Sequence, residues 1–284
     1  MNPRRTWLFV PGADAAAHAA AARSGADVIV LELEDFTPPE LRPKAYALAE
    51  EALASWRRAG ALAAVRVNPL ETCGNRDLAG VLVARPDLIM MSKVASPQQV
   101  VALEKATGGA VELVPNVESA AGLLNAYSIA KASPKVSALL VASEDMVADL
   151  GTERSRGGAE LAYVRARFLV ECRAAGVEAI DCPYTFSDAK GAIADARYAR
   201  RLGYRMKSLV DPSHAKGINS VFSVSQKELK HATLVVTAFE KARSKGKDRA
   251  KVGGALIEVP IYAAAKRLVE SAAQSSPPAR KRRR

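Results

Sequence analysis

The stretch Val28-Ile29-Val30-Leu31-Glu32-Leu33-Glu34-Asp35 sets a pattern that recurs along the chain. It opens with an apolar, mostly β-branched run without alternation of apolar and polar positions, which indicates a strand buried on both faces. Acidic side chains follow at the end of the run. An amphipathic stretch with alanine, leucine and charged residues comes next and predicts a helix. A parallel sheet covered by helices is the arrangement that such units build.

Seven further runs of this kind, separated by helical stretches, predict eight strands. The strand runs are Trp7–Pro11, Val28–Glu34, Ala63–Asn68, Leu88–Lys93, Val111–Glu118, Ala138–Glu144, Glu178–Tyr184 and Arg205–Asp211. Helical stretches include Pro97–Ala106, Ala120–Ala132, Tyr163–Ala175 and Ile193–Leu202. Eight strand–helix units in about 220 residues favour a (β/α)8 barrel, a TIM barrel. An open doubly wound sheet is the alternative, although no Gly-x-Gly-x-x-Gly motif follows the first run.

The composition changes after the eighth run. Ser225–Ala242 is typical of a helix, with Ser225 at the N-cap and Glu228 at the capping-box spacing. A polar basic linker is expected next, then a short extended piece and a helix within Ala255–Ala272 that is broken near Pro260. The predicted organisation is a barrel over residues 1–224, a C-terminal helical extension over 225–273 that either packs on the barrel or reaches a neighbouring subunit, and a disordered basic tail over 274–284.

Composition and charge exclude several classes of protein. With 49% hydrophobic and 25% charged residues the chain can bury a large core, which excludes a disordered chain or a disulfide scaffold. The net charge of +11 is uneven, because five Lys and Arg residues and no acid follow Gln274. No aromatic residue interleaves this tail and Pro277-Pro278 favours a frayed end, so we expect a solvated tail and no specific nucleic-acid recognition.

Membrane and secreted classes are also disfavoured. No run of 18 apolar residues occurs, so no membrane span or membrane partner is expected. The apolar run Trp7–Val10 is too short for a signal-peptide core. The three cysteines, Cys73, Cys172 and Cys182, are far apart and odd in number, and they fit neither a zinc spacing nor a secreted framework. These features predict a cytoplasmic protein.

Polar residues gather at the predicted carboxyl ends of the strands, where barrel enzymes carry their active sites. These ends contain Glu32–Asp35, Arg66–Asn68, Lys93, Asn116–Glu118, Ser143–Asp145, Asp181–Pro183, and Lys207 with Asp211. Carboxylates without a Cys or His cluster suit a hard cation such as Mg2+, which takes one or two carboxylates, waters and substrate oxygens. His18, His214 and His231 lie outside these ends, which disfavours a zinc site and a Ser-His-Asp triad.

Several short segments occur in a fixed order. They are Leu8–Gly12, Gly25–Asp27, Leu31–Asp35, Arg66–Asn68, Glu118–Ala120, Ser143–Gly151, Ala179–Asp181 and Phe222–Ser225. In this order they resemble the motifs of the citrate lyase β-subunit-like (CitE-like) family, which belongs to the wider group of HpcH/HpaI aldolases. The resemblance covers roughly residues 6–270. It is specific to the family and not to one substrate.

The resemblance implies a (β/α)8 barrel that makes or breaks a carbon–carbon bond beside an acyl thioester, usually of coenzyme A, with Mg2+ or, as the alternative, Mn2+. It implies that Glu118 and Asp145 are the metal ligands. Arg66 would hold the carbonyl or carboxylate oxygen beside the metal, as a catalytic and substrate-binding residue. Glu34 and Asp35 would orient metal-bound waters.

Each of these assignments has a structural alternative. Glu118 and Asp145 could be salt-bridge partners, and Arg66 could pair with Glu34. Glu34 and Asp35 could form ion pairs instead of standing beside a metal. Lys93 is expected to contact substrate; a Schiff base on it is disfavoured, because no second lysine or helper base is evident.

The resemblance also implies a proton donor from the adjacent subunit. Family members carry an Asp in a Gly-Lys-Met-Ile-Asp-x-Pro segment, and the matching stretch is Gly254–Pro260, in which Glu258 takes the place of that Asp. Glu258 is therefore the candidate catalytic acid, delivered across an interface in a homotrimer or a multiple of it. The stretch carries apolar residues that would be a liability if exposed on a monomer: Leu256, Ile257, Val259, Ile261 and Tyr262.

Departures from the family pattern leave the acyl group and the use of a thioester open. Glu32 stands for an Asp, Ser92 for a Pro, and Val210-Asp211-Pro212 for Ile-His-Pro. The preferred hypothesis for the function is a lyase that cleaves a 3-hydroxyacyl-CoA of the citryl, malyl or citramalyl type. The alternatives are an aldolase acting on a free 2-oxo or hydroxy acid without coenzyme A, and a non-catalytic binding protein that uses its basic tail. Candidate phosphate contacts favour the first: Lys207, Lys216 and the Lys241–Lys251 cluster.

Overall fold

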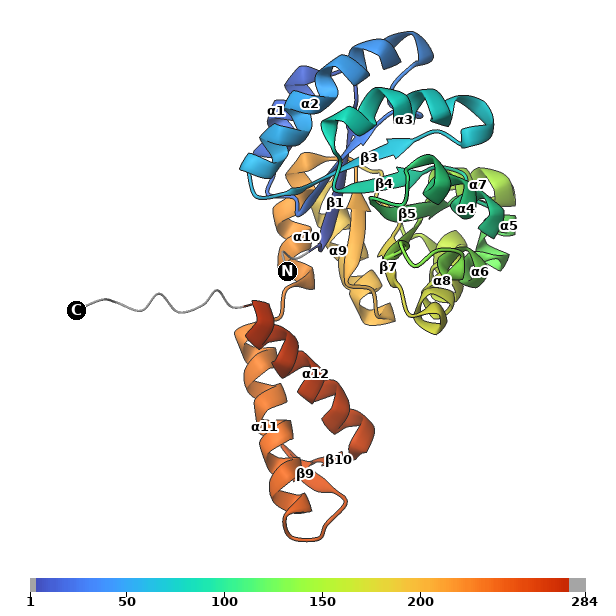
Figure 1. The fold of residues 1–284 in the computed structure, drawn as a ribbon. Coiled ribbons are helices and arrows are strands. Elements are labelled where there is room, and N and C mark those ends of the chain that lie inside the picture. Colours follow the sequence, from blue (N-terminus) through green and yellow to red (C-terminus); the bar gives the residue numbers. More distant parts are fainter. Residues whose placement is uncertain (1–3, 276–284) are drawn as a thin grey trace, which may run out of the picture. The chain divides into compact units, whose positions relative to one another are not determined.

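Eight parallel strands close into a barrel in the computed structural model, which describes residues 4–275 (Figure 1). Each strand pairs with the next, and β1 also pairs with β8, which closes the ring. The predicted (β/α)8 barrel is therefore confirmed, and the open sheet is excluded. The strands are β1 (Thr6–Pro11), β2 (Val28–Glu32), β3 (Leu62–Val67), β4 (Leu88–Met91), β5 (Glu112–Val117), β6 (Ala138–Val141), β7 (Glu178–Asp181) and β8 (Met206–Leu209).

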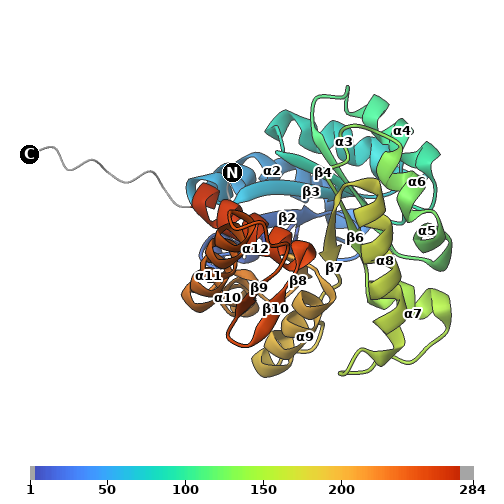
Figure 2. The same ribbon diagram turned by 90° about the horizontal axis from the view of Figure 1, so that it is seen from below.

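Helices surround the strands, as the view from below shows (Figure 2). They are α1 (Ala15–Ala22), α2 (Arg42–Arg58), α3 (Asn75–Val81), α4 (Pro97–Ala106), α5 (Ala120–Leu124), α6 (Ala126–Lys131), α7 (Glu144–Leu150), α8 (Ala162–Ala175), α9 (Ala189–Leu202) and α10 (Ala215–Phe222). Side-chain caps fix several starts, such as Asp14 before α1 and Asp188 before α9. The single helix expected over Ala120–Ala132 is two helices that meet at Asn125, whose Nδ2 donates to the Ala95 carbonyl.

Alternate residues of each strand fill the barrel, and the others pack against the helices. The inner cluster is Trp7, Phe9, Val28, Val30, Ala64, Leu88, Met90, Val114, Ala138, Leu140 and Ile180. Glu32, Arg66 and Asn116 each lie two residues after the last member of this cluster on their own strands. The same alternation therefore turns these three polar side chains into the barrel at its carboxyl end.

A buried ion-pair network lies on the outer side of β7 and β8. Lys207 Nζ is 2.6 Å from Asp181 Oδ2 and 2.5 Å from Asp195 Oδ2, and its side chain is fully buried. Arg165 of α8 pairs with the same two acids at 2.6 and 2.8 Å. The expectation that Lys207 contacts a phosphate at the rim is therefore wrong. The alternation of side chains along β8 points Lys207 outward, between the strands and the helices.

Lys216 also lies too far from the carboxyl end of the barrel to contact a phosphate at an active site there. It lies in the first turn of α10, and its Cγ lies against Gly25 in the loop that leads into β2. That loop belongs to the amino end of the strands, opposite the end where active sites of such barrels lie.

The C-terminal unit, from residue 223 onward, has its own elements. They are α11 (Gln226–Arg243), β9 (Ala250–Val252), β10 (Ala255–Ile257) and α12 (Val259–Ser275). The capping box of Ser225 and Glu228 is confirmed. The expected linker is in part a strand, because β9 pairs antiparallel with β10 across Gly253-Gly254, both at positive φ. Pro260 lies in the first turn of α12 and does not break it, since no intrahelical N–H bond is lost there.

A small apolar core holds this unit together. Phe239 of α11 stacks on Tyr262 of α12, with ring centroids 4.6 Å apart, and Ile257 is buried beside them. Of the residues expected on an exposed patch, Ile257 is thus a core residue and Tyr262 is partly buried against that core. The exposed apolar residues of the segment are Leu256, Val259 and Ile261.

Three further features bear on the sequence expectations. All three cysteines are free thiols, with Cys172 and Cys182 buried and Cys73 half-exposed. Across residues 4–275, every helix is too short or too polar to span a bilayer. The predicted disordered tail lies outside the described residues from 276 on, and α12 includes Gln274 and Ser275.

Candidate active site

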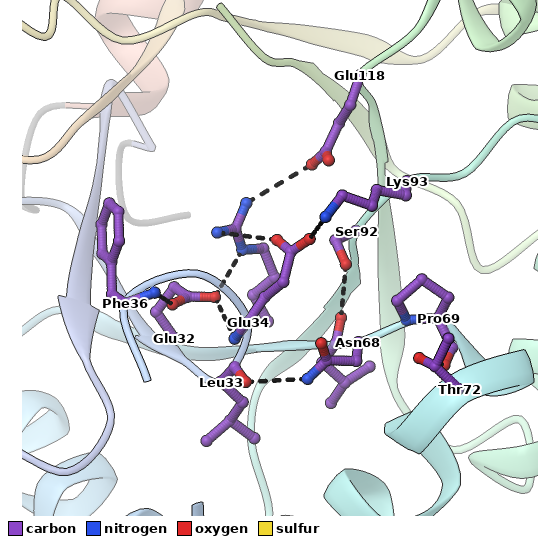
Figure 3. Close-up of polar contacts among 12 residues, drawn as sticks. Glu32, Leu33, Glu34, Phe36, Asn68, Pro69, Thr72, Ser92, Lys93 and Glu118 are labelled. Atoms are coloured by element: carbon purple, nitrogen blue, oxygen red, sulfur yellow. Dashed lines mark hydrogen bonds and ion pairs between the residues drawn. The ribbon is translucent and has the colours of Figure 1, made fainter. Parts of the chain in front are cut away.

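Charged side chains from four neighbouring strands meet at the carboxyl end of the barrel (Figure 3). Glu34 follows β2, Arg66 lies on β3, Lys93 follows β4 and Glu118 follows β5. Arg66 Nη2 lies 3.1 Å from Glu34 Oε2, and its Nη1 lies 3.6 Å from Glu118 Oε1. Lys93 Nζ lies 2.6 Å from Glu34 Oε1. The structure brings these four predicted site residues together, and the ion pair between Arg66 and Glu34 is real.

Glu32 organises this cluster, and the sequence analysis assigned it no role. Its buried carboxylate accepts a hydrogen bond from Arg66 Nε at 3.0 Å and from the backbone N–H groups of Glu34 and Phe36 at 2.6 Å each. Arg66 also lies over the Phe9 ring, 5.0 Å from its centroid. Glu32 thus fixes both the guanidinium and the turn that carries Glu34. Its inward position, in step with Val28 and Val30, was the signal that could have found it.

Glu118 is a buried carboxylate that lacks a hydrogen bond. Its side chain is 2% exposed, and both carboxylate oxygens lack a hydrogen-bond partner. Burial raises the pKa of Glu118 to about 8, against the lowering effect of Arg66. A bare buried carboxylate is costly, and a bound cation would remove that cost.

Buried polar atoms without hydrogen bonds concentrate at this end. Within residues 4–275 they belong to Glu34, Asn116, Glu118 and His214. Glu34 is compensated by ion pairs with Arg66 and Lys93. Unsatisfied polar atoms are rare in folded proteins, so their concentration beside Arg66 points to a ligand-binding site.

Asp145 lies in the first turn of α7 and is partly buried. Its pKa is raised, first by burial and then by the negative charges of Asp35 and Glu34, so the three carboxylates lie within electrostatic reach of one another. The neighbouring Glu144 accepts hydrogen bonds from Arg154 at 3.1 Å and from Thr185 at 2.7 Å. These contacts hold the start of α7 and with it Asp145.

Lys93 adopts a left-handed backbone conformation directly after β4. Its φ is +55°, which is uncommon for a residue with a side chain and often marks a functional position. The close ion pair with Glu34 raises the pKa of Lys93, and about half of the side chain is exposed. A protonated ammonium is a poor nucleophile, which agrees with the expectation against a Schiff base.

The donor set fits a hard divalent cation. Glu118 and Asp145 offer carboxylate oxygens, and Glu34 and Asp35 stand nearby. Among the described residues, no three His, Cys, Asp or Glu side chains form a complete cation cage. Mg2+ commonly binds through one or two carboxylates and completes its shell with water and substrate oxygens, so a pair of ligands is sufficient.

Glu258 belongs to the C-terminal unit. It directly precedes α12, its side chain is 51% exposed, and its Oε1 lies 3.5 Å from Arg249 Nε. The carboxylate is accessible, and its ion pair with Arg249 is long.

Comparison with known proteins identifies the family of the chain. Residues 5–212 match the family model described as HpcH/HpaI aldolase/citrate lyase. The chain is 32% identical to the citrate lyase subunit beta of Leuconostoc mesenteroides subsp. cremoris, over 95% of this chain and 93% of that protein. It is 30% identical to an L-malyl-CoA/beta-methylmalyl-CoA lyase of Cereibacter sphaeroides, over 95% of each protein.

A solved structure covers both units. The protein CitE from Mycobacterium tuberculosis, in complex with magnesium, acetoacetate and coenzyme A, superposes with a TM-score of 0.79 at 26% identity, over 95% of this chain and 98% of that one. The family model, the full-length relatives and the barrel agree, and the chain belongs to the HpcH/HpaI aldolase/citrate lyase family of carbon–carbon lyases.

Proposed function

We propose that the protein is a Mg2+-dependent lyase that cleaves a 3-hydroxyacyl-CoA thioester of the citryl, malyl or citramalyl type. The observation that carries the proposal is the Glu118 carboxylate, buried without a hydrogen bond 3.6 Å from Arg66. Relatives named as citrate lyase subunit beta and as a malyl-CoA lyase support it, as does a homologous structure that contains magnesium and coenzyme A.

Glu118 and Asp145 would hold the cation, with Mn2+ as the alternative to Mg2+. When bound, the cation supplies Lewis acidity, which lowers the pKa of the substrate hydroxyl and stabilises the developing oxyanion. Glu34 and Asp35 would stand beside it, where their oxygens accept hydrogen bonds from water.

Arg66 supplies fixed positive charge where the oxyanion grows. Glu32 and the Phe9 ring place the guanidinium before substrate arrives, so no reorganisation is needed during the reaction. Lys93, half-exposed at the mouth, is placed to contact a substrate carboxylate. The substrate hydroxyl gives up its proton to water and becomes a carbonyl as the carbon–carbon bond breaks, and the electron pair of that bond leaves as an enolate on the thioester fragment.

The enolate carbon must then take a proton. Glu258 is the proposed donor, delivered by a neighbouring subunit in a homotrimer or a multiple of it. In this proposal the extension over residues 225–273 packs on the neighbour. The exposed, loosely paired carboxylate of Glu258 and the exposed Leu256, Val259 and Ile261 support it.

An aldolase acting on a free acid is the second candidate. Lys207 and Lys216, two of the cations expected to contact the phosphates of coenzyme A, do not lie at the active rim. Arg156, in the loop before α8, is 67% exposed and lies 4.8 Å from the Phe186 ring, so it offers one cation at that rim.

A metal-dependent cleavage assay separates these candidates. The purified protein is tested with citryl-, malyl- and citramalyl-CoA and with the corresponding free acids, with Mg2+ and after chelation. Cleavage of a thioester that chelation abolishes supports the proposal, and cleavage of free acids alone supports the second candidate. If none of these compounds is cleaved with Mg2+ or Mn2+, the proposed function is wrong.

A further inference from the structure

Asn116 lies inside the barrel, below the proposed metal ligand. On β5, Val114 belongs to the inner cluster, whereas Leu113 and Val117 pack outward. Asn116 and Glu118 therefore follow Val114 on the inner face, and Asn116 is about 7 Å deeper along the strand than Glu118. Its side chain is fully buried.

The amide of Asn116 has no hydrogen-bond partner. Neither Nδ2 nor Oδ1 is bonded within the described protein, although its backbone carbonyl accepts from Val94 N–H. An unbonded buried amide destabilises the fold, and an apolar side chain of similar size would not carry that cost.

The other buried asparagines of the described chain behave differently. Asn68 Nδ2 donates to the Leu33 carbonyl at 2.9 Å. Asn219 Nδ2 donates to the Gly25 carbonyl at 2.7 Å, and its Oδ1 accepts from Thr6 at 2.9 Å. Buried asparagines with a structural role are thus bonded within the fold, and Asn116 is the exception.

The position of Asn116 suggests what it bonds. The acyl-CoA is too large to enter the barrel thioester first, so the fragment that leaves as a 2-oxo acid lies deepest, next to Glu118 and Arg66. Candidate fragments differ in the substituent on the carbonyl carbon: hydrogen, methyl or carboxymethyl. An amide offers a donor and an acceptor to an oxygen-bearing substituent and nothing to a methyl group.

We infer that Asn116 contacts the 2-oxo acid fragment and selects one that carries an oxygen-bearing substituent, such as oxaloacetate, over pyruvate. The inference rests on the proposed function and names the substrate class of that site. A polar site disfavours the analogue that lacks the bonding group, because the site group is then left unpaired.

The test compares Asn116→Leu with Asn219→Leu, the same change at a bonded asparagine at the opposite end of the barrel. Mg2+-dependent binding of fresh oxaloacetate and of pyruvate is measured by calorimetry, together with kcat/KM for citryl-CoA and citramalyl-CoA. Unfolding midpoints are measured without ligand. Asn116→Leu is expected to unfold no earlier than wild type and to lose about 10- to 100-fold of the preference for the oxygen-bearing ligand.

Asn219→Leu is expected to unfold earlier and to keep the preference. If Asn116→Leu keeps the wild-type preference, the inference is overturned, whatever its stability. Asn116→Ala, which is smaller and cannot clash, repeats the comparison if the leucine variant does not fold. Wild-type protein that binds neither acid with Mg2+ and cleaves none of citryl-, malyl- and citramalyl-CoA contradicts the proposed function as well. A wild type that discriminates, with a variant that discriminates equally, contradicts this inference alone.

Discussion

Arg66 illustrates how single residues set the chemistry of this barrel. Its guanidinium faces Glu32, Glu34 and Glu118, which together raise its pKa although burial alone would lower it. Arg66 and Lys93 are the two cations of the cluster, and carboxylates outnumber them because Asp35 and Asp145 also face it. The excess of negative charge favours a divalent cation, and Arg66 keeps its own charge throughout.

Glu118→Gln and Asp145→Asn are each expected to abolish Mg2+ binding and to leave the fold intact. Each change removes a ligand charge from a site that has only two proposed ligands. Calorimetric titration checks this, with Glu171→Gln, an acid paired with Arg167 on α8, as the control. Unchanged Mg2+ affinity in both variants would contradict the assignment of Glu118 and Asp145 as metal ligands.

The raised pKa of Glu118 makes cation binding depend on pH. Below pH 8 this carboxyl group holds a proton that the cation must displace, because its pKa is raised to about 8 from an ordinary 4.5. Mg2+ affinity is expected to rise about tenfold per pH unit from about pH 6 to about pH 8, then level off. In the metal-free protein, the raised pKa of Glu118 makes the free energy of unfolding fall as pH rises from about 4.5 to about 8. Titrations in buffers of different protonation heat would count the released proton; pH-independent affinity argues against the shift.

Arg66→Lys tests whether the guanidinium acts on the oxyanion. Lysine keeps the charge but loses the planar fork that Glu32 and Glu34 hold. Turnover on the true substrate is expected to fall about 100- to 1000-fold, the usual cost of one such donor. Steady-state kinetics measures this, beside Arg167→Lys on the surface of α8. Wild-type turnover would make Arg66 a structural residue.

At the scale of elements, the ion-pair network outside β7 and β8 shows that a charged strand residue can point away from the barrel interior and have a structural role. Lys207→Met would leave Asp181 and Asp195 short of a buried counter-charge, so unfolding is expected to be easier by about 3–5 kcal/mol. Urea denaturation measures this, and Lys216→Met, an exposed position, should change stability by less than about 0.5 kcal/mol. Equal effects in the two variants would contradict the network.

The sequence was sufficient for the barrel and for four members of the charged cluster, Glu34, Arg66, Lys93 and Glu118. Buried parallel strands are continuous apolar runs, and their polar ends converge. The sequence was not sufficient for details that depend on distant contacts. The break at Asn125 coincides with a hydrogen bond from its side chain to the Ala95 carbonyl, 30 positions earlier. Lys207 was expected at the rim of the barrel, but its side chain points outward. That direction depends on the register of β8. Glu32 was passed over because its role depends on Arg66 of the next strand.

At the scale of the whole molecule, the C-terminal unit bears on assembly. Leu256, Val259 and Ile261 are 45%, 50% and 47% exposed, which is costly for a monomer. We predict that Arg66→Ala subunits, inactive alone, regain activity when mixed with inactive Glu258→Ala subunits, because one intact site can form from two chains. Activity after confirmed subunit exchange checks this. No recovery would mean that Glu258 acts within its own chain or not at all.

The unequal burial of the three cysteines gives the molecule a built-in attachment point for a probe. Burial raises the pKa of Cys172 and Cys182 and removes them from solvent, so neither presents a thiolate to a maleimide at neutral pH. Cys73 is half-exposed, just beyond β3, and its Sγ lies 2.9 Å from Arg42 Nη1. A fluorophore placed there, without mutagenesis, would sit on the segment that follows Arg66 and Asn68 and could follow ligand arrival in real time.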